Sequence, residues 1–133
     1  MKQITIRLKP KEDLKQSILI VAKKFHVKAG VVVSSVGSLT KVMLRLSVIK
    51  GKPIYKEISG DFEILSLNGT IANNGSGCHL HMSVSDKEGK VHGGHLMEGC
   101  TIKTTVELVI LVFNDTVYTR AIDLKTGFQE LNF

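Results

Sequence analysis

The chain has 133 residues, a length typical of one domain that can bury a core without disulfides. It holds 18 Lys and Arg against 12 Asp and Glu, a net charge of +6, and 43% of its residues are hydrophobic. Two cysteines do not suggest a disulfide framework, the N-terminus MKQITIRLKP lacks the apolar segment of a signal peptide, and no apolar run approaches membrane-spanning length. We therefore expect an intracellular, cytoplasmic protein with no membrane partner.

Positive charge is concentrated in the first part of the chain. Residues 1–56 hold 13 Lys and Arg against two acids, a net of +11, whereas residues 57–133 hold 5 against 10, a net of −5. A basic segment favours contact with nucleic acid, but the sequence has no helix-turn-helix pattern and no basic stripe interleaved with aromatic residues. Three interpretations stay open: weak, non-specific DNA binding, interleaving of the two halves in the fold, or contact between opposite halves of neighbouring subunits.

The chain begins with one strand and one helix. Apolar and polar residues alternate over Ile4–Lys9, which predicts a half-buried strand. Apolar residues then recur at helical spacing from Leu14 to Phe25, opposite a lysine-rich face, and Asp13 is suited to cap the first turn. We expect this helix to stop by Gly30.

The remainder is rich in β-branched residues and predicts strands separated by Gly, Pro and Asn turns. The expected strands are Gly30–Val36, Thr40–Ile49, Tyr55–Leu67, Cys78–Asp86, Lys90–Met97, Thr101–Phe113 and Thr116–Leu124. We expect Gly37-Ser38 to separate the first two, and Phe128–Phe133 to be a mobile tail or to dock on a neighbour.

The order of these elements restricts the fold. Seven or eight strands with one helix cannot form a doubly wound parallel sheet, which needs a crossover helix between successive strands. We therefore expect an α+β fold in a single domain over residues 1–133: a largely antiparallel, curved sheet or flattened barrel with one main N-terminal helix.

Four of the five histidines lie in the segment 78–99. In an extended strand His79 and His81 point to one face, while Leu80 and Met82 point to the other. The apolar face is expected in the core, and the histidine face at a cleft or a neighbour. Cys78 shares the parity of Leu80, so we expect a buried small hydrophobic residue there rather than a metal ligand.

The turn that follows determines which histidines meet. Lys87-Glu88-Gly89 predicts a three-residue hairpin loop with Gly89 in the left-handed conformation. This register places His81 opposite His95, with His79 one step along the same face. His92 falls on the other face, opposite Val84, unless Gly93-Gly94 forms a bulge that turns it.

Three histidines from two adjacent strands can hold a divalent transition metal, with zinc as the default, and leave one position for water or a ligand. The double glycine beside His95 would let backbone or ligand approach. The alternative is that His79, His81 and His95 hydrogen-bond one another at a polar strand face.

Six segments together resemble a known family. They are Gly37-Ser38-Leu39, Val42-Met43-Leu44-Arg45, Gly60-Asp61-Phe62-Glu63-Ile64-Leu65-Ser66-Leu67-Asn68-Gly69-Thr70, His79-Leu80-His81-Met82-Ser83, Gly93-Gly94-His95-Leu96 and Thr105-Val106-Glu107. The chain resembles the plant-and-prokaryote-conserved domain family over nearly its whole length, most specifically at the two ends of the histidine hairpin.

The resemblance implies an α+β domain that assembles as a homotrimer, with a metal held by His79, His81 and His95 and a DNA-binding or regulatory role. Plant relatives carry an AT-hook before the domain, and this sequence contains none. In the segment that the resemblance assigns to oligomer or partner contacts, Asp61 stands where plant relatives have Arg. The residues of that segment are Gly60, Phe62, Glu63, Ile64 and Leu65.

The histidine pattern is also similar to that of zinc-dependent acetolactate decarboxylases. This implies, as the alternative function, a zinc-dependent lyase or hydrolase that acts on a small oxygenated substrate. Glu63, Glu107 and Arg45 are the candidate catalytic groups. Each also has a structural interpretation. Glu63 can be a strand residue that alternates with Phe62 and Ile64, Glu107 can pair with Lys103 or Arg45, and Arg45 can be a solvated strand residue.

Overall fold

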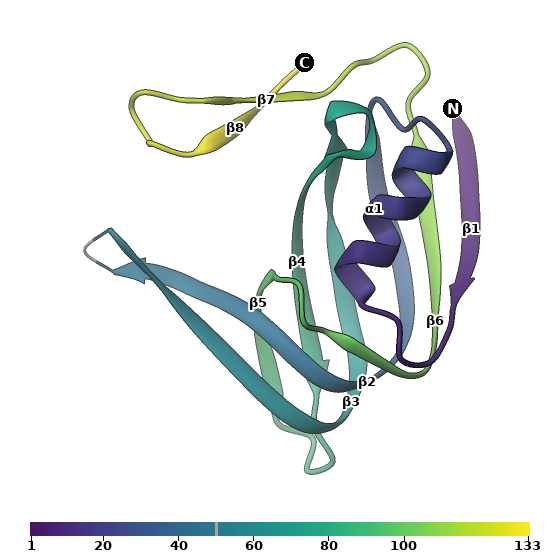
Figure 1. Cartoon of the computed structure of the whole chain (residues 1–133), viewed down its shortest axis with the longest axis vertical. Helices are drawn as coiled ribbons and strands as arrows, with labels where there is room; N and C mark the ends of the chain where they lie inside the picture. The colour runs from purple at the N-terminus through teal and green to yellow at the C-terminus, as the bar shows by residue number, and fades with distance from the viewer. Residues whose placement is uncertain (50) are drawn as a thin grey trace.

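A computed structural model describes residues 1–49 and 51–133. Most of the chain forms a six-stranded sheet in the order β1-β6-β2-β3-β4-β5, and one helix lies across a face of this sheet (Figure 1). The strands are β1 (Lys2–Leu8), β2 (Gly30–Ile49), β3 (Lys52–Ala72), β4 (Gly77–Ser85), β5 (Val91–Leu96) and β6 (Thr101–Val112). The strand pairs of the sheet are antiparallel, which confirms the predicted α+β class.

The sheet curls back on itself at one end. Besides its main partners β3 and β6, β2 also pairs with β5, placing Leu44 opposite Leu96 and Arg45 opposite His95. Beyond this point the far ends of β2 and β3 continue as a two-stranded arm that projects from the body (Figure 1). The curved antiparallel sheet was predicted, and the β2–β5 contact brings the histidine hairpin against the middle of the chain.

The helix α1 (Leu14–Lys24) begins where the sequence predicts. One carboxylate oxygen of Asp13 accepts from the backbone N–H of Gln16 at 2.9 Å, and the other accepts from that of Gly99 at 2.6 Å. The cap therefore also fastens the helix to the segment after β5. Among the described residues, no helix is long and apolar enough to cross a membrane.

The buried face of α1 is shorter than the sequence pattern predicts. Leu14, Ile18 and Ala22 are buried, but Phe25 is 40% exposed because it follows the last helical turn. Its ring lies beneath the ammonium groups of Lys2 and Lys24 instead.

The predicted break at Gly37-Ser38 is wrong, because β2 runs unbroken from Gly30 to Ile49. A side chain at Gly37 would lie 2.1 Å from the carbonyl oxygen of Thr105. Glycine therefore permits the close approach of β6 to β2 and does not end the strand.

The C-terminal segment is also ordered differently from the prediction. It forms a second, two-stranded sheet of β7 (Thr119–Ile122) and β8 (Gln129–Asn132). The residues expected to be a mobile tail therefore pair with their own chain. The hairpin docks near the short helix η1 (Asn73–Gly75), because the backbone N–H of Asn73 donates to the carbonyl of Tyr118 at 2.9 Å.

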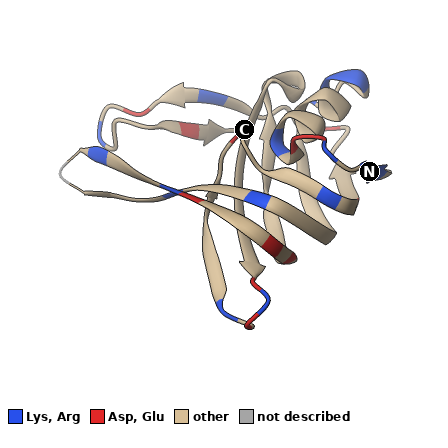
Figure 2. Cartoon of the chain, turned by 60° about the horizontal axis from the view of Figure 1, so that its bottom comes forward, with Lys and Arg blue, Asp and Glu red and all other residues tan. Residues whose placement is uncertain are grey.

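Basic and acidic parts of the sequence interleave in the sheet. The basic strands β1 and β2 both pair with β6, from the acidic half. Lys41 pairs with Glu57 at 3.1 Å, and Lys103 pairs with Asp61 at 2.8 Å, so the predicted partner Glu107 is not the one that Lys103 uses. Figure 2 shows Lys and Arg dispersed over several elements among Asp and Glu. The sequence left three interpretations of the uneven charge open. The structure of the single chain shows the second of them, in which the basic and acidic halves interleave in the fold.

Candidate metal centre

Strand β4 separates an apolar face from a histidine face, as predicted. Leu80, Met82 and Val84 are at most 2% exposed and belong to the core. His79 and His81 alternate with them and are exposed on the opposite face. The core contacts of the apolar residues thus fix the direction in which both imidazoles point.

The β4–β5 turn has the predicted form. Gly89 has a φ of +79°, and its N–H donates to the carbonyl of Asp86 at 3.0 Å. The carboxylate of Asp86 accepts from the backbone N–H groups of Glu88 and Lys90 at 3.0 and 2.9 Å. The turn sets the register of the two strands, in which His81 lies opposite His95.

The three predicted histidines come together. One ring nitrogen from each of His79, His81 and His95 lies within 4.8 Å of the other two. The Nε2 atoms of His79 and His81 are 3.1 Å apart, and the three ring centroids are separated by 5.0–5.4 Å. Imidazole nitrogens converging from two strands form a set of potential metal ligands.

Arg45 lies against the third histidine. Its strand position is directly opposite His95, and its Nη2 donates to Nδ1 of His95 at 3.4 Å. This contact depends on Gly94, where a side chain would lie only 2.8 Å from the carbonyl oxygen of Arg45. The predicted backbone approach at the double glycine therefore occurs at Gly94.

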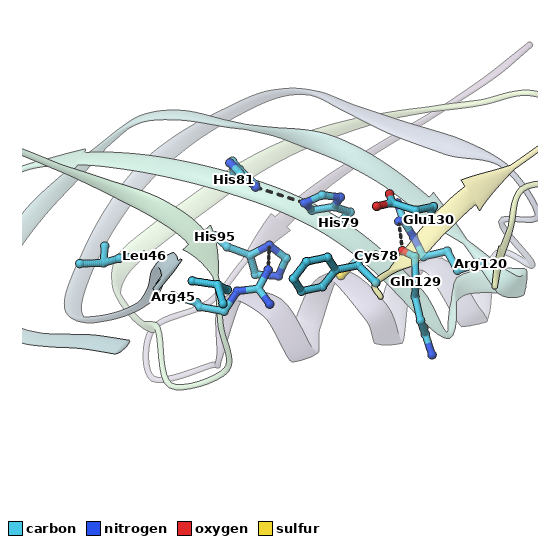
Figure 3. A pocket seen from close by; sticks show the side chains of 11 residues that line it. Arg45, Leu46, Cys78, His79, His81, His95, Arg120, Gln129 and Glu130 are labelled. Atoms are coloured by element: carbon cyan, nitrogen blue, oxygen red, sulfur yellow. Dashed lines mark hydrogen bonds between the residues drawn. The ribbon is translucent and has the colours of Figure 1, made fainter. Parts of the chain in front are cut away.

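A cavity of about 640 Å³ opens over the three histidines (Figure 3). Arg45, Leu46 and Cys78 contribute to its walls from the body of the sheet. The opposite side is built by the β7–β8 hairpin, with Arg120, Phe128, Gln129 and Glu130.

Arg120 is the second arginine at the cavity, and no motif in the sequence points to it. Its Nη2 donates to Oγ1 of Thr70 at 2.7 Å, and Thr70 lies opposite His79 in the β3–β4 pair. Its Nη1 donates to the carbonyl of Gln129 at 3.2 Å. No local signal relates Arg120 to the histidines, because their proximity depends on how the C-terminal hairpin folds back.

Partial burial and nearby positive charge favour the neutral forms of His79 and His95. Partial burial and the nearby Arg45 lower the pKa of His95 to about 4. Partial burial and the nearby Arg120 also lower the pKa of His79 from its usual value. Neutral imidazole is the form that binds a metal, so both residues are suited to ligation at neutral pH.

Cys78 packs against the core, as predicted, but it is only partly buried and one side of it reaches the cavity. Burial raises the pKa of its thiol, which disfavours the thiolate that a metal would need. It is not part of the cluster of potential ligands.

His92 lies on the other face, opposite Val84, and is not part of the cluster. Its Nε2 donates to the carboxylate of Asp86 at 2.9 Å, and its Nδ1 accepts from the ammonium of Lys56 at 3.1 Å. Its ring is nearly perpendicular to that of Phe62, with centroids 6.3 Å apart. Its contacts are therefore those of a residue that supports the turn.

The other candidate residues lie away from the cavity. Glu63 is exposed on β3 between Ser38 and Ser85, and Glu107 is exposed on β6 opposite Arg7. Of the three catalytic candidates, the structure brings only Arg45 to the histidines.

The segment expected to form partner contacts is divided between core and surface. Phe62 and Ile64 are 4% and 7% exposed, so both belong to the core of their own chain. Gly60, Glu63 and Leu65 face outward, and Leu65 is 54% exposed. Leu65 lies at the bulge between the Ile64 and Ser66 pairs of β3.

The sequence profile of the Plants and Prokaryotes Conserved (PCC) domain matches residues 1–114. The chain belongs to the PCC domain family. This confirms the resemblance inferred from the short segments, and the profile extends from β1 to the end of β6.

The PCC domain is similar to proteins of several bacteria and archaea. It is 39% identical over 132 residues to the bifunctional protein GlmU of Synechococcus sp. strain JA-2-3B'a(2-13), covering 99% of this chain and 20% of that protein. The chain thus spans about a fifth of the length of the curated relatives it matches. A solved structure of a hypothetical protein from Salmonella cholerae-suis has a TM-score of 0.90 and 34% identity, covering 98% of this chain and 91% of that one.

A metal-containing protein from Archaeoglobus fulgidus has a TM-score of 0.87 and 25% identity, covering 100% of this chain and 94% of that one. More distant structures show the fold alone. A candidate DNA-binding protein from Ralstonia eutropha JMP134 has 20% identity, and a Staphylococcus aureus protein similar to alpha-acetolactate decarboxylase has 14% identity and a TM-score of 0.56.

Proposed function

We propose that this PCC domain binds one divalent transition metal per subunit, with zinc as the first choice, through His79, His81 and His95. The observation that supports the proposal is the convergence of three ring nitrogens within 4.8 Å from two hydrogen-bonded strands. The Archaeoglobus relative, described as metal-containing, is consistent with it.

The spacing of the nitrogens fits the proposed metal. Zinc–nitrogen bonds are about 2.0–2.1 Å long, so two ligands of a tetrahedral site lie about 3.3 Å apart. The Nε2 atoms of His79 and His81 are already 3.1 Å apart, and a ring nitrogen of His95 lies within 4.8 Å of the ligand atoms of both. Three protein ligands leave the fourth coordination position of a tetrahedral metal free, and this position would open into the cavity above the histidines.

We also propose that the domain assembles as a homotrimer. Large apolar side chains are exposed on the β2–β3 arm, where Ile49 and Tyr55 are each 54% exposed, and Leu65 is exposed on β3. A stable monomer gains nothing by exposing these groups, whereas burial between subunits would remove them from water. The proposed contact surface therefore comprises Leu65 with its neighbours Gly60 and Glu63, and the arm.

We also propose that the protein has a regulatory role in the cytoplasm and contacts DNA weakly. The net charge of +6 would supply attraction to phosphates, but basic residues are interleaved with acidic ones. Neither cysteine is in a disulfide, in keeping with a reducing compartment.

The alternative function is a zinc-dependent lyase or hydrolase on a small oxygenated substrate, and the cavity favours it. Its volume of about 640 Å³ is within the range of small-molecule sites. A metal would supply Lewis-acid polarisation of a substrate oxygen, and Arg45 is placed to hold negative charge beside it. Among the described residues that line the cavity, Glu130 is the one carboxylate that could transfer a proton.

The metal proposal is tested by elemental analysis of protein purified without added metal. We expect about one equivalent of metal per chain in the natural sequence and in His92→Ala, because His92 lies on the opposite face. His81→Ala should lose most of it, because two imidazoles bind far more weakly than three. Full metal content in His81→Ala, or its loss in a folded His92→Ala, would contradict the assignment.

A further inference from the structure

We propose that the cavity over His79, His81 and His95 binds a small organic oxyanion, which Arg45 and Arg120 hold beside the metal. The inference rests on the proposed metal site and specifies the kind of molecule that this site would take. Arg45 and Arg120 support the inference, because both line this cavity.

In the part that the structure describes, neither Arg45 nor Arg120 forms an ion pair. Glu130 also lines the cavity, but its carboxylate accepts from the hydroxyl of Thr126 at 3.0 Å. Two guanidinium groups and one carboxylate, that of Glu130, thus border the three histidines, and a divalent cation would increase the positive excess.

The hydrogen bonds of the arginines are also incomplete. Each guanidinium has five N–H donors, and the Nε–H groups of both Arg45 and Arg120 are buried without an acceptor from the protein. Among the described residues, the one side-chain hydrogen bond of Arg45 is the 3.4 Å interaction with His95, which is long for a hydrogen bond. A buried donor without a partner in the protein needs an explanation, and a bound ion or water molecule is one such explanation.

Metal binding would release Arg45 for this role. A neutral imidazole has a single acceptor nitrogen, and in His95 that nitrogen now accepts from Arg45. If the acceptor nitrogen binds a metal instead, the guanidinium loses its partner at the edge of the cavity. We therefore expect the anion to bind the metal-loaded protein more tightly than the metal-free protein, since the metal and Arg45 both become available to it.

The cavity walls favour an organic molecule over a bare ion. Arg45 and Arg120 enter from different elements, β2 and β7, while Leu46 and Phe128 supply apolar surface between strand and hairpin. The planar fork of a guanidinium matches both carboxylate and phosphate oxygens. The shared chemistry is therefore an oxyanion attached to a small carbon skeleton.

The test uses protein loaded with cobalt, whose visible absorption reports on ligands at the metal. Malonate is the carboxylate probe, methylphosphonate the phosphate-type probe and malonamide the neutral control, each titrated by calorimetry and by absorption. We expect malonate or methylphosphonate to bind and to change the cobalt spectrum, with whichever binds more tightly identifying the oxyanion. Malonamide should not bind.

The variants Arg45→Gln and Arg120→Gln should each weaken binding at least tenfold, with cobalt content unchanged. Arg7→Gln is the matched control, because Arg7 lies on β1 outside the cavity, and it should bind like the natural sequence. Two results would overturn the proposal. One is an affinity in both cavity variants equal to that of the natural sequence, and the other is binding of malonamide as tight as that of the anions.

The same titration of metal-free protein separates the two proposals. If cobalt is not retained but the anion still binds and needs both arginines, the metal proposal fails and the anion site stands. If cobalt is retained and neither anion binds, the anion site fails and the metal proposal stands.

Discussion

His81 lies directly opposite His95 across the antiparallel β4–β5 pair, with their ring centroids 5.4 Å apart. A shift of this pair by one residue would move His95 to the opposite face of the sheet. The histidine cluster is therefore a property of strand register, and changes that alter the packing of β4 against its neighbours should alter the cluster as well.

Gly69→Ala should destabilise the fold and disturb the histidines. Gly69 has a φ of +137°, and an added side chain would lie 1.9 Å from the carbonyl oxygen of His79. Strain and overpacking together should cost about 3 kcal/mol of unfolding free energy. Urea denaturation measures this loss, and elemental analysis should show reduced metal content.

Gly127→Ala is the control for that substitution. Gly127 also has a positive φ, of +73°, but nothing lies within 4 Å of an added side chain. The left-handed conformation alone should cost about 1 kcal/mol, and metal content should stay the same. Equal losses in the two variants would show that the close approach to His79 is not the cause.

The metal-free protein should become less stable as pH falls from about 6.5 to about 4. The pKa of His95 is lowered to about 4 in the folded chain, against about 6.5 for an unfolded histidine. Between these values the unfolded state binds more protons, so acid favours unfolding. NMR titration of the His95 ring in metal-free protein gives the folded pKa directly.

Arg45→Gln tests the cause of this shift. Partial burial is the larger contribution and remains, so the pKa of His95 should rise only part of the way toward 6.5. A pKa that does not change in Arg45→Gln would show that the guanidinium does not act on this imidazole.

The protein should be a homotrimer in solution, with a mass three times 14.6 kDa. Light scattering coupled to size exclusion at micromolar concentration measures it. Leu65→Asp should lower the mass, since a charge would be placed in the proposed contact surface. Ile20→Asp is the control, because Ile20 is 64% exposed on the helix α1. A monomeric mass for the natural sequence would contradict the proposed homotrimer.

Any binding to DNA should be weak, little dependent on sequence and strongly dependent on salt. Phosphate contacts release counterions, so their contribution falls steeply as salt rises. Fluorescence anisotropy with two unrelated duplexes at several salt concentrations measures both properties. Tight binding to one duplex at physiological salt would require a base-reading element that neither sequence nor fold suggests.

The sequence by itself determined the local part of this protein. The alternation of apolar residues and histidines along β4 predicted which side chains lie in the core and which face outward, because successive side chains of a strand point to opposite faces. Gly89 specified the turn and hence the pairing of His81 with His95, because only a few loops join two strands in register. The family also followed from short segments, since their residues retain their order and spacing.

Only the tertiary structure decided what surrounds the histidines. Arg45 reaches His95 because β2 curls onto β5 at Gly94, and Arg120 reaches the cavity because the C-terminal hairpin folds back over Thr70. Both contacts join segments far apart in the chain, and no periodicity encodes such distances. Gly37 shows where the sequence prediction failed. A glycine can serve either a turn or the close approach of two strands, and the sequence predicted a turn there. Only the packing of β2 against β6 showed that Gly37 serves the close approach.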